Sequence, residues 1–384
     1  MTLTRRDVLK GAGASLALGA AGCGIFGGGE SKDLVPRQTM PLNAEPRLDE
    51  LVESWSTPYS QFFVRTHGTM PAVSPATWRL RVEGLVTRTM SFSLQDLQRM
   101  PSVAVPATIQ CAGNRGEEMN LVKPVTGVLW DAGAIGTAEW KGVKLSEILD
   151  RVGAKPSAKY VWFEGLDAVT LKDRQTLFGG HLSIAKATQP ETIIALEMDG
   201  RPLTREHGFP ARTVVPGFVG ARSVKWLGRI VVSDRKSENF FVARDYKLFP
   251  PDVSAETSNP KDVEPITENL LNSAICDPRA GQAVGAGKLK LRGYALPPGI
   301  PGVGLSSVEV SADGGGTWTS ASLRGKDAPF CWKLWSAELD VTPGPRTLVV
   351  RATDTKGGTQ PERAPWNFKG YLYNGWHRVP ITVT

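Results

Sequence analysis

The stretch "ATIQCAGNRG", residues 107–116, sets one cysteine at the end of a predicted buried strand. Most lone cysteines in such positions are core thiols. Here Gln110, Asn114 and Arg115 add hydrogen-bonding groups and a positive charge beside Cys111, and the residues between them are small. A thiolate suits a soft metal as a ligand. Cys111 is therefore a candidate metal ligand, to be weighed against the rest of the chain.

The composition indicates a chain rich in strands and turns. Glycine (41) and proline (28) are too frequent among the 384 residues for a helical bundle. The length favours two domains, and we expect a β-rich α+β fold. The net charge of +7 is spread along the chain without a block of like charge. This pattern argues against nucleic acid as a partner and favours a basic pocket for a small anion.

Several common metal motifs are missing from the sequence. The four histidines (His67, His181, His207 and His377) lie far apart, which excludes an HExxH site. The sequence contains no CxxCH for covalent haem and no CxxC pair for zinc or an iron–sulfur cluster. A metal at Cys111 would therefore belong to another type of site.

The first 30 residues are typical of an address for export. In "TRRDVLKGAGASLALGAAGCG", residues 4–24, Arg5 and Arg6 precede a weakly apolar Gly/Ala stretch, as in a twin-arginine signal peptide. That route carries folded proteins, often with a cofactor inside. We expect the protein outside the cytoplasmic membrane, in the periplasm. "AAGC" also resembles a lipoprotein cleavage site at Cys23, so a lipid anchor stays an open alternative.

Two bodies follow the signal peptide in the predicted organisation. Residues 31–47 indicate an extended polar arm, and residues 48–255 a mixed α and β domain. Within it, "SLQDLQRM" predicts a short helix capped by Ser93, and "KLSEILDRVG" a helix that ends at Gly153.

The pattern changes after the proline-rich link over residues 249–265. Alternating strands separated by Gly, Pro and Asp turns fill residues 265–384, with no helix of convincing length. We predict an immunoglobulin-like β-sandwich. Such a module more often mediates contact than chemistry, so pairing of subunits into a homodimer is its expected role.

A second group of polar residues lies in "REHGFPARTVVPGFVGARSVKWLGRIVVS", residues 205–233. His207, Arg212, Arg222 and Lys225 occur among glycines. Backbone N–H groups of glycine-rich turns together with basic side chains suit a phosphate-bearing cofactor. The alternative is a pair of buried strands with a basic edge.

Together these segments resemble one family, the molybdenum-cofactor sulfite oxidases. The resemblance rests on the following motifs, in this order: "FFVRTH" (62–67), "IQCAGNR" (109–115), "GVLWDAGAIGTAEWKGVKLSEIL" (127–149), "FEGLD" (163–167), "EHGFPARTVVPGFVGARSVKWLGRI" (206–230), "RDYK" (244–247) and "WHRV" (376–379). It covers nearly all of the mature chain. It implies a mixed α/β molybdopterin-binding domain, followed by an immunoglobulin-like dimerisation domain.

The resemblance also implies a cofactor, molybdenum-molybdopterin, and roles for particular residues. Cys111 would bind molybdenum beside two dithiolene sulfurs of the pterin. The residues expected to contact the rest of the cofactor are Phe63, Arg65, His67, Asp167, His207, Arg212, Ser223, Val224 and Lys225, the last three at its phosphate. The residues expected around the oxyanion substrate are Arg65, Trp130, Tyr246 and Arg378.

Without the resemblance, several of these residues have a structural interpretation. Trp130 suits a core, Tyr246 a surface pair with Asp245, and Arg65 an edge strand or a salt bridge. Cys276 and Cys331 are either a disulfide or two buried thiols.

One position departs from the family pattern. Sulfite-oxidising members often have an arginine facing the substrate five residues after the metal cysteine, where this chain has Gly116. Arg115 precedes that position and need not point the same way. A lost cation weakens the binding of a dianion by roughly 1–3 kcal/mol.

The function that the resemblance implies is oxygen-atom transfer to sulfite. With no haem motif in the chain, we expect electrons to pass to an external acceptor, such as a c-type cytochrome. Two alternatives stay open: reduction of another oxyanion or a sulfoxide at the same centre, and an exported binding protein without enzymatic activity.

Overall fold

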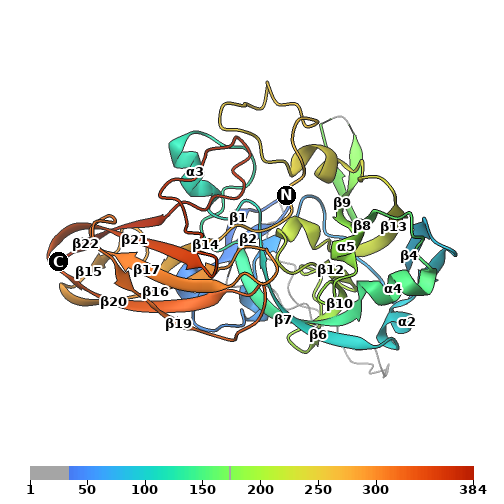
Figure 1. Ribbon diagram of the computed structural model, residues 1–384, viewed down its shortest axis with the longest axis horizontal. Coiled ribbons are helices and arrows are strands. Elements are labelled where there is room, and N and C mark those ends of the chain that lie inside the picture. Colours follow the sequence, from blue (N-terminus) through green and yellow to red (C-terminus); the bar gives the residue numbers. More distant parts are fainter. Residues whose placement is uncertain (1–33, 173) are drawn as a thin grey trace, which may run out of the picture.

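The computed structural model describes residues 34–172 and 174–384. They form an N-terminal body of several sheets and short helices, followed by an elongated β-sandwich (Figure 1). The predicted signal peptide and Cys23 lie outside the described residues. In the described part of the chain, no helix combines the length and apolar character needed to cross a membrane.

Strands outnumber helices in the N-terminal body. The strands are β1 (Leu34–Gln38), β2 (Asn43–Pro46), β3 (Val64–Arg65), β4 (Leu80–Gly84), β5 (Met90–Phe92), β6 (Ser102–Gln110), β7 (Ile135–Lys144), β8 (Tyr160–Thr170), β9 (Gln175–Ser183), β10 (Ile193–Met198), β11 (Arg201–Pro202), β12 (Arg212–Val214) and β13 (Leu227–Ser233). The helices and helical turns are α1 (Leu48–Leu51), η1 (Tyr59–Gln61), α2 (Leu94–Gln98), α3 (Gly116–Val122), α4 (Leu145–Val152), α5 (Ile184–Ala187), η2 (Gly220–Arg222) and η3 (Phe241–Asp245).

These strands form three sheets. The orders are β1-β2-β3, β11-β10-β7-β6 with β12 also paired to β10, and β5-β4-β13-β8-β9. Strands β4 and β13 run parallel, and the other named pairs are antiparallel. Strand β6 is the outer strand of the second sheet, and it ends directly before Cys111.

The two helices predicted from sequence begin and end as expected. The Ser93 hydroxyl accepts a hydrogen bond from Asp96 N–H, and the Asp96 carboxylate accepts one from Ser93 N–H, which makes a capping box at α2. Helix α4 ends at Gly153, whose φ of 64° lies in the left-handed region that favours glycine. The buried face of α4 comprises Leu145, Ile148, Leu149 and Val152.

The predicted sandwich is confirmed over the C-terminal part of the chain. Its strands are β14 (Asn272–Asp277), β15 (Ala283–Val284), β16 (Gly287–Leu296), β17 (Leu305–Ser311), β18 (Thr319–Ser320), β19 (Ser322–Arg324), β20 (Lys333–Val341), β21 (Gly344–Asp354) and β22 (His377–Val383). They form two sheets, β14-β16-β20-β19 and β15-β22-β21-β17-β18. The alternating strands bury one apolar face each between the sheets, and residues 265–384, all described, contain no helix.

The segment predicted as an extended polar arm is ordered instead. Residues 34–46 form the β1–β2 hairpin, which pairs with β3. Glu45 is almost fully buried, and its carboxylate accepts hydrogen bonds from the N–H groups of Asp131 and Gly133 and from Arg37. A proline-dotted polar sequence gave no sign of these partners, because they come from a distant loop.

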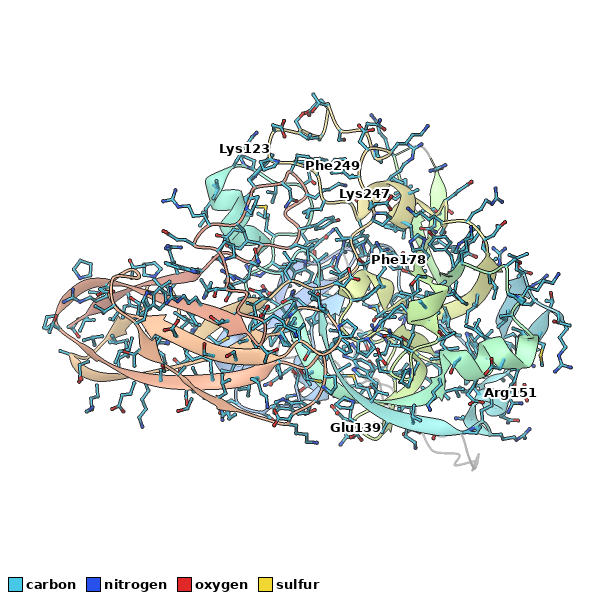
Figure 2. The ribbon with its side chains drawn as sticks, viewed as in Figure 1. Lys123, Glu139, Arg151, Phe178, Lys247 and Phe249 are labelled. Atoms are coloured by element: carbon cyan, nitrogen blue, oxygen red, sulfur yellow. The ribbon has the colours of Figure 1, made fainter. Side chains whose placement is uncertain are left out.

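The sandwich packs directly on the N-terminal body. Trp55 Nε1 donates to Trp332 O at 3.1 Å, Trp332 Nε1 donates to Trp55 O at 2.9 Å, and Trp332 N donates to Thr108 Oγ1 at 2.8 Å. Figure 2 shows the resulting contrast of environments: Phe178 lies in the interior, and Lys123, Glu139 and Arg151 lie outside.

The buried cysteines of the described chain are thiols. Cys111, Cys276 and Cys331 are all free, so the disulfide between Cys276 and Cys331 is not formed. Burial raises the pKa of Cys331 to about 12 and that of Cys276 further, which keeps both thiols protonated and unreactive.

Candidate functional site

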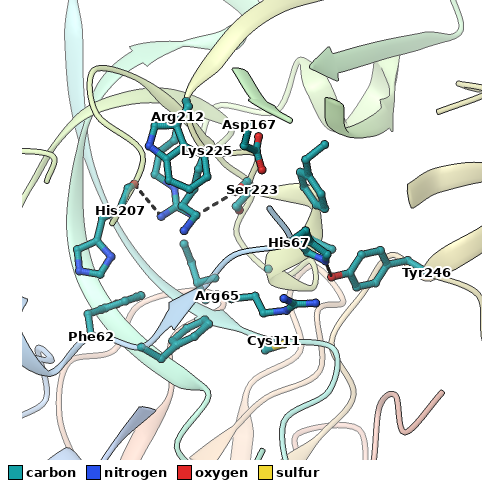
Figure 3. A pocket seen from close by; sticks show the side chains of 16 residues that line it. Phe62, Arg65, His67, Cys111, Asp167, His207, Arg212, Ser223, Lys225 and Tyr246 are labelled. Carbon is teal, nitrogen blue, oxygen red and sulfur yellow. Dashed lines mark hydrogen bonds between the residues drawn. The ribbon is translucent and has the colours of Figure 1, made fainter. Parts of the chain in front are cut away.

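A cavity of about 590 Å³ lies inside the N-terminal body (Figure 3). This volume is in the range of ligand pockets. Its wall consists of Phe62, Phe63, Arg65, His67, Ile109, Cys111, Asp167, Phe178, His207, Arg212, Gly220, Ala221, Ser223, Lys225, Trp226 and Tyr246. Segments more than 180 residues apart in the sequence therefore meet at one site.

Cys111 lies at one end of this cavity, on the turn that follows β6. Its N–H donates to Ala134 O at 2.9 Å, and its carbonyl accepts from Asn114 N at 3.0 Å, so both sides of the turn are fixed. Burial raises the pKa of the thiol, and the Arg65 guanidinium and the Gly113 N–H oppose that rise. A metal cation bound to the sulfur would displace the proton outright.

Next to Cys111, Arg65, His67 and Tyr246 form a polar wall. Arg65 ends strand β3 and donates to Asn43 Oδ1 at 3.1 Å and to Thr66 O. His67 Nε2 lies 2.8 Å from the Tyr246 hydroxyl oxygen. Burial, then Arg65 and Lys225, hold the pKa of His67 well below its usual range, so this imidazole is neutral.

Tyr246 stays protonated throughout the physiological range. Burial raises its pKa, and the Arg65 guanidinium lowers it by less. Its phenol is therefore a hydrogen-bond donor at the same end of the cavity as Cys111.

Trp130 and Phe63 form the apolar side of the site. Their rings meet edge to face at 6.4 Å, and Phe63 stacks on Phe62 at 5.4 Å. Trp130 is only 1% exposed, and the space beside Gly113, which we expected to admit a large ligand, is filled by its indole: a Cβ at Gly113 would lie 3.3 Å from Trp130 Cδ1. Trp130 thus packs against the cysteine turn rather than lining the cavity wall.

The opposite end of the cavity is basic. Arg212 begins strand β12 and donates to His207 O at 3.2 Å and to Ser223 O at 3.1 Å, and Lys225 Nζ donates to Glu206 O at 2.7 Å. Within the described residues, neither cation has a carboxylate within ion-pair distance. Burial lowers the pKa of Arg212 to about 9, and burial with Arg212 lowers that of Lys225.

Asp167 and His207 complete this basic end. Asp167 Oδ1 is buried and has no hydrogen-bond partner in the described part of the chain, and burial raises the pKa of the carboxyl although Lys225 opposes the rise. The His207 ring contacts Tyr59 and Phe62 edge-on, and burial lowers its pKa to about 3. Both groups keep polar atoms available to a ligand with N–H and O–H groups.

Ser223 and Val224 contribute in a different way. The Ser223 hydroxyl accepts from Val215 N at 3.1 Å, and Val224 N donates to Thr213 Oγ1 at 2.7 Å. The Val224 side chain is fully buried in the core. These two residues therefore hold the loop between η2 and β13 in place, and Lys225 is the member of the trio whose charge faces the cavity.

Comparison with known proteins identifies this type of site. A family model described as the oxidoreductase molybdopterin binding domain matches residues 67–241, and one described as the Mo-co oxidoreductase dimerisation domain matches residues 263–384. The sulfite oxidase of Arabidopsis thaliana is 36% identical over 366 residues, which cover 89% of this chain and 92% of the plant protein. The chain belongs to the molybdenum-cofactor sulfite oxidase family.

Other family members extend the comparison. The mitochondrial sulfite oxidase of Homo sapiens is 42% identical over 357 residues, covering 90% of this chain. The chain spans 65% of the length of that human protein. The crystal structure of the sulfane dehydrogenase from Paracoccus pantotrophus superimposes with a TM-score of 0.77 at 28% identity, covering 89% of this chain and 84% of that one.

The residues of the cavity fit the molybdenum cofactor of this family. A phosphate would neutralise Arg212 and Lys225, which lack anionic partners within the described chain. A pterin N–H group would supply the partner that Asp167 Oδ1 lacks. At the other end, Cys111 is the single thiol on the cavity wall and would ligate the metal.

One predicted site residue of this sulfite oxidase family member lies elsewhere. Arg378, expected in the oxyanion pocket, belongs to strand β22, and its guanidinium donates to the Glu362 carboxylate at 2.9 Å and to Glu362 O. The prediction was wrong because "WHR" alone does not fix the direction of an exposed strand residue.

The sandwich instead contributes residues 369–372 to the site. Lys369 Nζ forms a 2.6 Å ion pair with Asp245, the neighbour of Tyr246. Tyr371 stacks on Tyr246, and Leu372 N donates to the carbonyl of Ala112, next to Cys111. Sequence analysis missed these residues, although "FKGYLY" carries a cation and two tyrosines without a clear strand pattern.

Arg115 points away from the cavity. Its fully buried guanidinium forms two bonds to the Glu118 carboxylate, at 2.6 and 2.9 Å, and others to Asn272 Oδ1 and Ser273 O of strand β14. Arg115 is thus a structural link to the sandwich and does not replace the cation absent at Gly116.

Proposed function

We propose that this protein oxidises sulfite to sulfate. The overall reaction combines sulfite and water to give sulfate, two protons and two electrons. The observation that carries the proposal is the meeting, in one cavity, of the Cys111 thiol with Arg65 and Tyr246, opposite the basic end at Arg212 and Lys225. Sulfite oxidase relatives of 36% and 42% identity support the choice of substrate.

The chain's own residues bind and orient the reactants. The cofactor, held by Cys111 at its metal, supplies the oxygen-atom transfer and accepts the two electrons. Arg65 neutralises an oxygen of the anion, and the protonated Tyr246 donates a hydrogen bond to it. Neutral His67, 2.8 Å from the Tyr246 hydroxyl, fixes the direction of that phenol.

Other residues hold the cofactor in this proposal. Arg212 and Lys225 pair with its phosphate, while Asp167 and His207 bind polar groups of the pterin. Phe63 packs along it, and the loop containing Ser223 and Val224 supports Lys225. Trp130 keeps the cysteine turn in place by filling the space beside Gly113.

The compartment and partners are also proposals. The twin arginines at Arg5 and Arg6 support export to the periplasm, with a lipid anchor at Cys23 as an alternative to a free mature chain. An external acceptor, such as a c-type cytochrome, would take the electrons one at a time. The match to a dimerisation domain over residues 263–384 supports a homodimer.

Cys111→Ser tests the assignment. Protein from a host that makes the cofactor should contain about one molybdenum per chain and reduce ferricyanide with sulfite, whereas Cys111→Ser should lose at least 1,000-fold in kcat, roughly 4 kcal/mol. A serine oxygen is a poorer ligand for a soft, sulfur-bound metal. Cys331→Ser, outside the cavity, should retain activity. Near-parent turnover in Cys111→Ser would refute the assignment.

Gly116 favours a second candidate function. Without a cation at that position, the pocket is less suited to a dianion, and the same centre would run as a reductase of another oxyanion or a sulfoxide. Turnover of nitrate, chlorate or sulfoxides with a reduced dye, compared with turnover of sulfite with ferricyanide, separates the two directions.

A further inference from the structure

A loop of the sandwich domain closes over the cysteine turn. It connects β21 to β22, and its Leu372 N–H donates to Ala112 O at 2.7 Å. Asn367 fixes the preceding residue on both sides: its Oδ1 accepts from Tyr371 N at 3.0 Å, and its Nδ2 donates to Tyr371 O at 2.8 Å. The backbone of Tyr371 is therefore held beside the Cys111 end of the cavity.

The ring of Tyr371 lies against Tyr246, the phenol that faces the cavity. The two rings are nearly parallel, with 8° between their planes and 5.2 Å between their centroids. Burial and the charge of Asp245 raise the pKa of Tyr371, and Arg65 opposes that rise. Tyr371 is therefore a second protonated phenol at the end of the cavity that holds Arg65, Tyr246 and Cys111.

The same loop lies beside the position of the missing cation. A Cβ at Gly116 would lie 3.4 Å from Gly370 O, the carbonyl that directly precedes Tyr371. A side chain at 116 would thus start next to this loop. The described neighbours of this corner supply a phenol from the sandwich where a guanidinium from helix α3 is absent.

We propose that Tyr371 is a specificity-determining residue of the oxyanion pocket, whose hydroxyl donates a hydrogen bond to an oxygen of the bound anion. This inference rests on the proposed function of the same site. A neutral donor compensates part of the charge lost at Gly116, and it favours small oxyanions with an oxygen to accept from a phenol. The C-terminal domain thereby takes part in substrate selection.

Tyr371→Phe is the direct test, because it keeps the ring stacked on Tyr246 and removes one hydroxyl. In the holoenzyme, KM for sulfite should rise about tenfold with kcat within twofold of the parent, since a contact made equally in ground and transition states affects KM alone. The Kd of sulfate, measured by calorimetry, should weaken by a similar factor. Tyr373→Phe is the matched control: that ring lies 5.1 Å from the Arg115 guanidinium and should change neither constant.

The two measurements separate this inference from the proposed function. If the parent oxidises sulfite and Tyr371→Phe leaves both KM and the sulfate Kd unchanged, the role of Tyr371 is overturned. If the parent does not oxidise sulfite but binds sulfate about tenfold more tightly than Tyr371→Phe does, the role of Tyr371 is supported and the proposed function fails.

Discussion

Gly116 is the residue at which this chain departs most clearly from the family pattern. It begins helix α3, is buried, and has Gly370 O as the nearest atom that a Cβ would meet, at 3.4 Å. That distance is ordinary van der Waals contact, so a side chain can start there without displacing the backbone. The absence of a cation, rather than a lack of space, defines this position.

Gly116→Arg should therefore strengthen sulfite binding. An added charge-assisted hydrogen bond contributes about 1.5–3 kcal/mol, so KM for sulfite should fall about tenfold or more. Steady-state kinetics with ferricyanide measure the change. Leu121→Arg, which adds the same charge at an 83% exposed position of α3, is the control and should leave KM unchanged at moderate salt. An unchanged KM in Gly116→Arg would mean that the pocket is arranged differently.

Single residues also mark the limit of sequence analysis at the site. The strand-end cysteine and the basic residues at 207–225 were recognisable, because their chemistry is unusual for a core. The contribution of the sandwich was assigned to Arg378, whereas the structure brings Lys369 and Tyr371 to Asp245 and Tyr246. Local sequence gives no direction to a loop whose position depends on a contact with Ala112, some 260 residues earlier.

At the level of elements, the link between β6 and α3 joins the two domains. Arg115 caps α3 with a φ of 64°, an uncommon left-handed conformation for arginine. Its buried guanidinium holds Glu118 on one side and strand β14 on the other. The cysteine turn therefore derives its position from both the N-terminal body and the sandwich.

Arg115→Met should destabilise the protein. Removing one partner of a buried ion pair costs about 3–5 kcal/mol, because the remaining charge loses its partner. Urea unfolding of the parent and the variant measures the loss. Arg81→Met, which removes an arginine bonded to Glu83 from a well-exposed site, should cost less than 1 kcal/mol. Equal stability of Arg115→Met and the parent would contradict the structural role of Arg115.

Elements with strong local signals were predictable, and those fixed by distant partners were not. The capping box at Ser93 and the terminal Gly153 identified α2 and α4 directly. The β1–β2 hairpin was missed, because Glu45 is stabilised by N–H groups of residues 131 and 133 that no local pattern reveals.

For the whole molecule, the histidines set the response to acid. His181 and His377 lie outside the cavity wall and accept hydrogen bonds from Ser237 N and Ile275 N. Burial, followed by nearby arginines, lowers the pKa of His181 to about 4 and that of His377 to about 3. Both are therefore neutral in the folded protein near pH 6, where an unfolded histidine starts to take up a proton.

The free energy of unfolding should fall as the pH drops below 6.5. In that range the unfolded chain binds protons that the folded chain does not, which costs about 1.4 kcal/mol per pH unit for each histidine until its folded pKa is reached. Urea midpoints between pH 7.5 and 5 measure the slope. His181→Asn, whose amide oxygen can still accept from Ser237 N, should reduce the slope by about one proton. A slope unchanged by that substitution would exclude His181 as a contributor.

The contact between Leu372 and Ala112 also fixes an order of events during synthesis. One wall of the cavity comes from the final segment of the polypeptide, so no nascent chain can finish the chamber while that segment is still inside the ribosome. Maturation of the site is consequently a step that follows translation, and a chain truncated before residue 372 would leave the chamber open on that side.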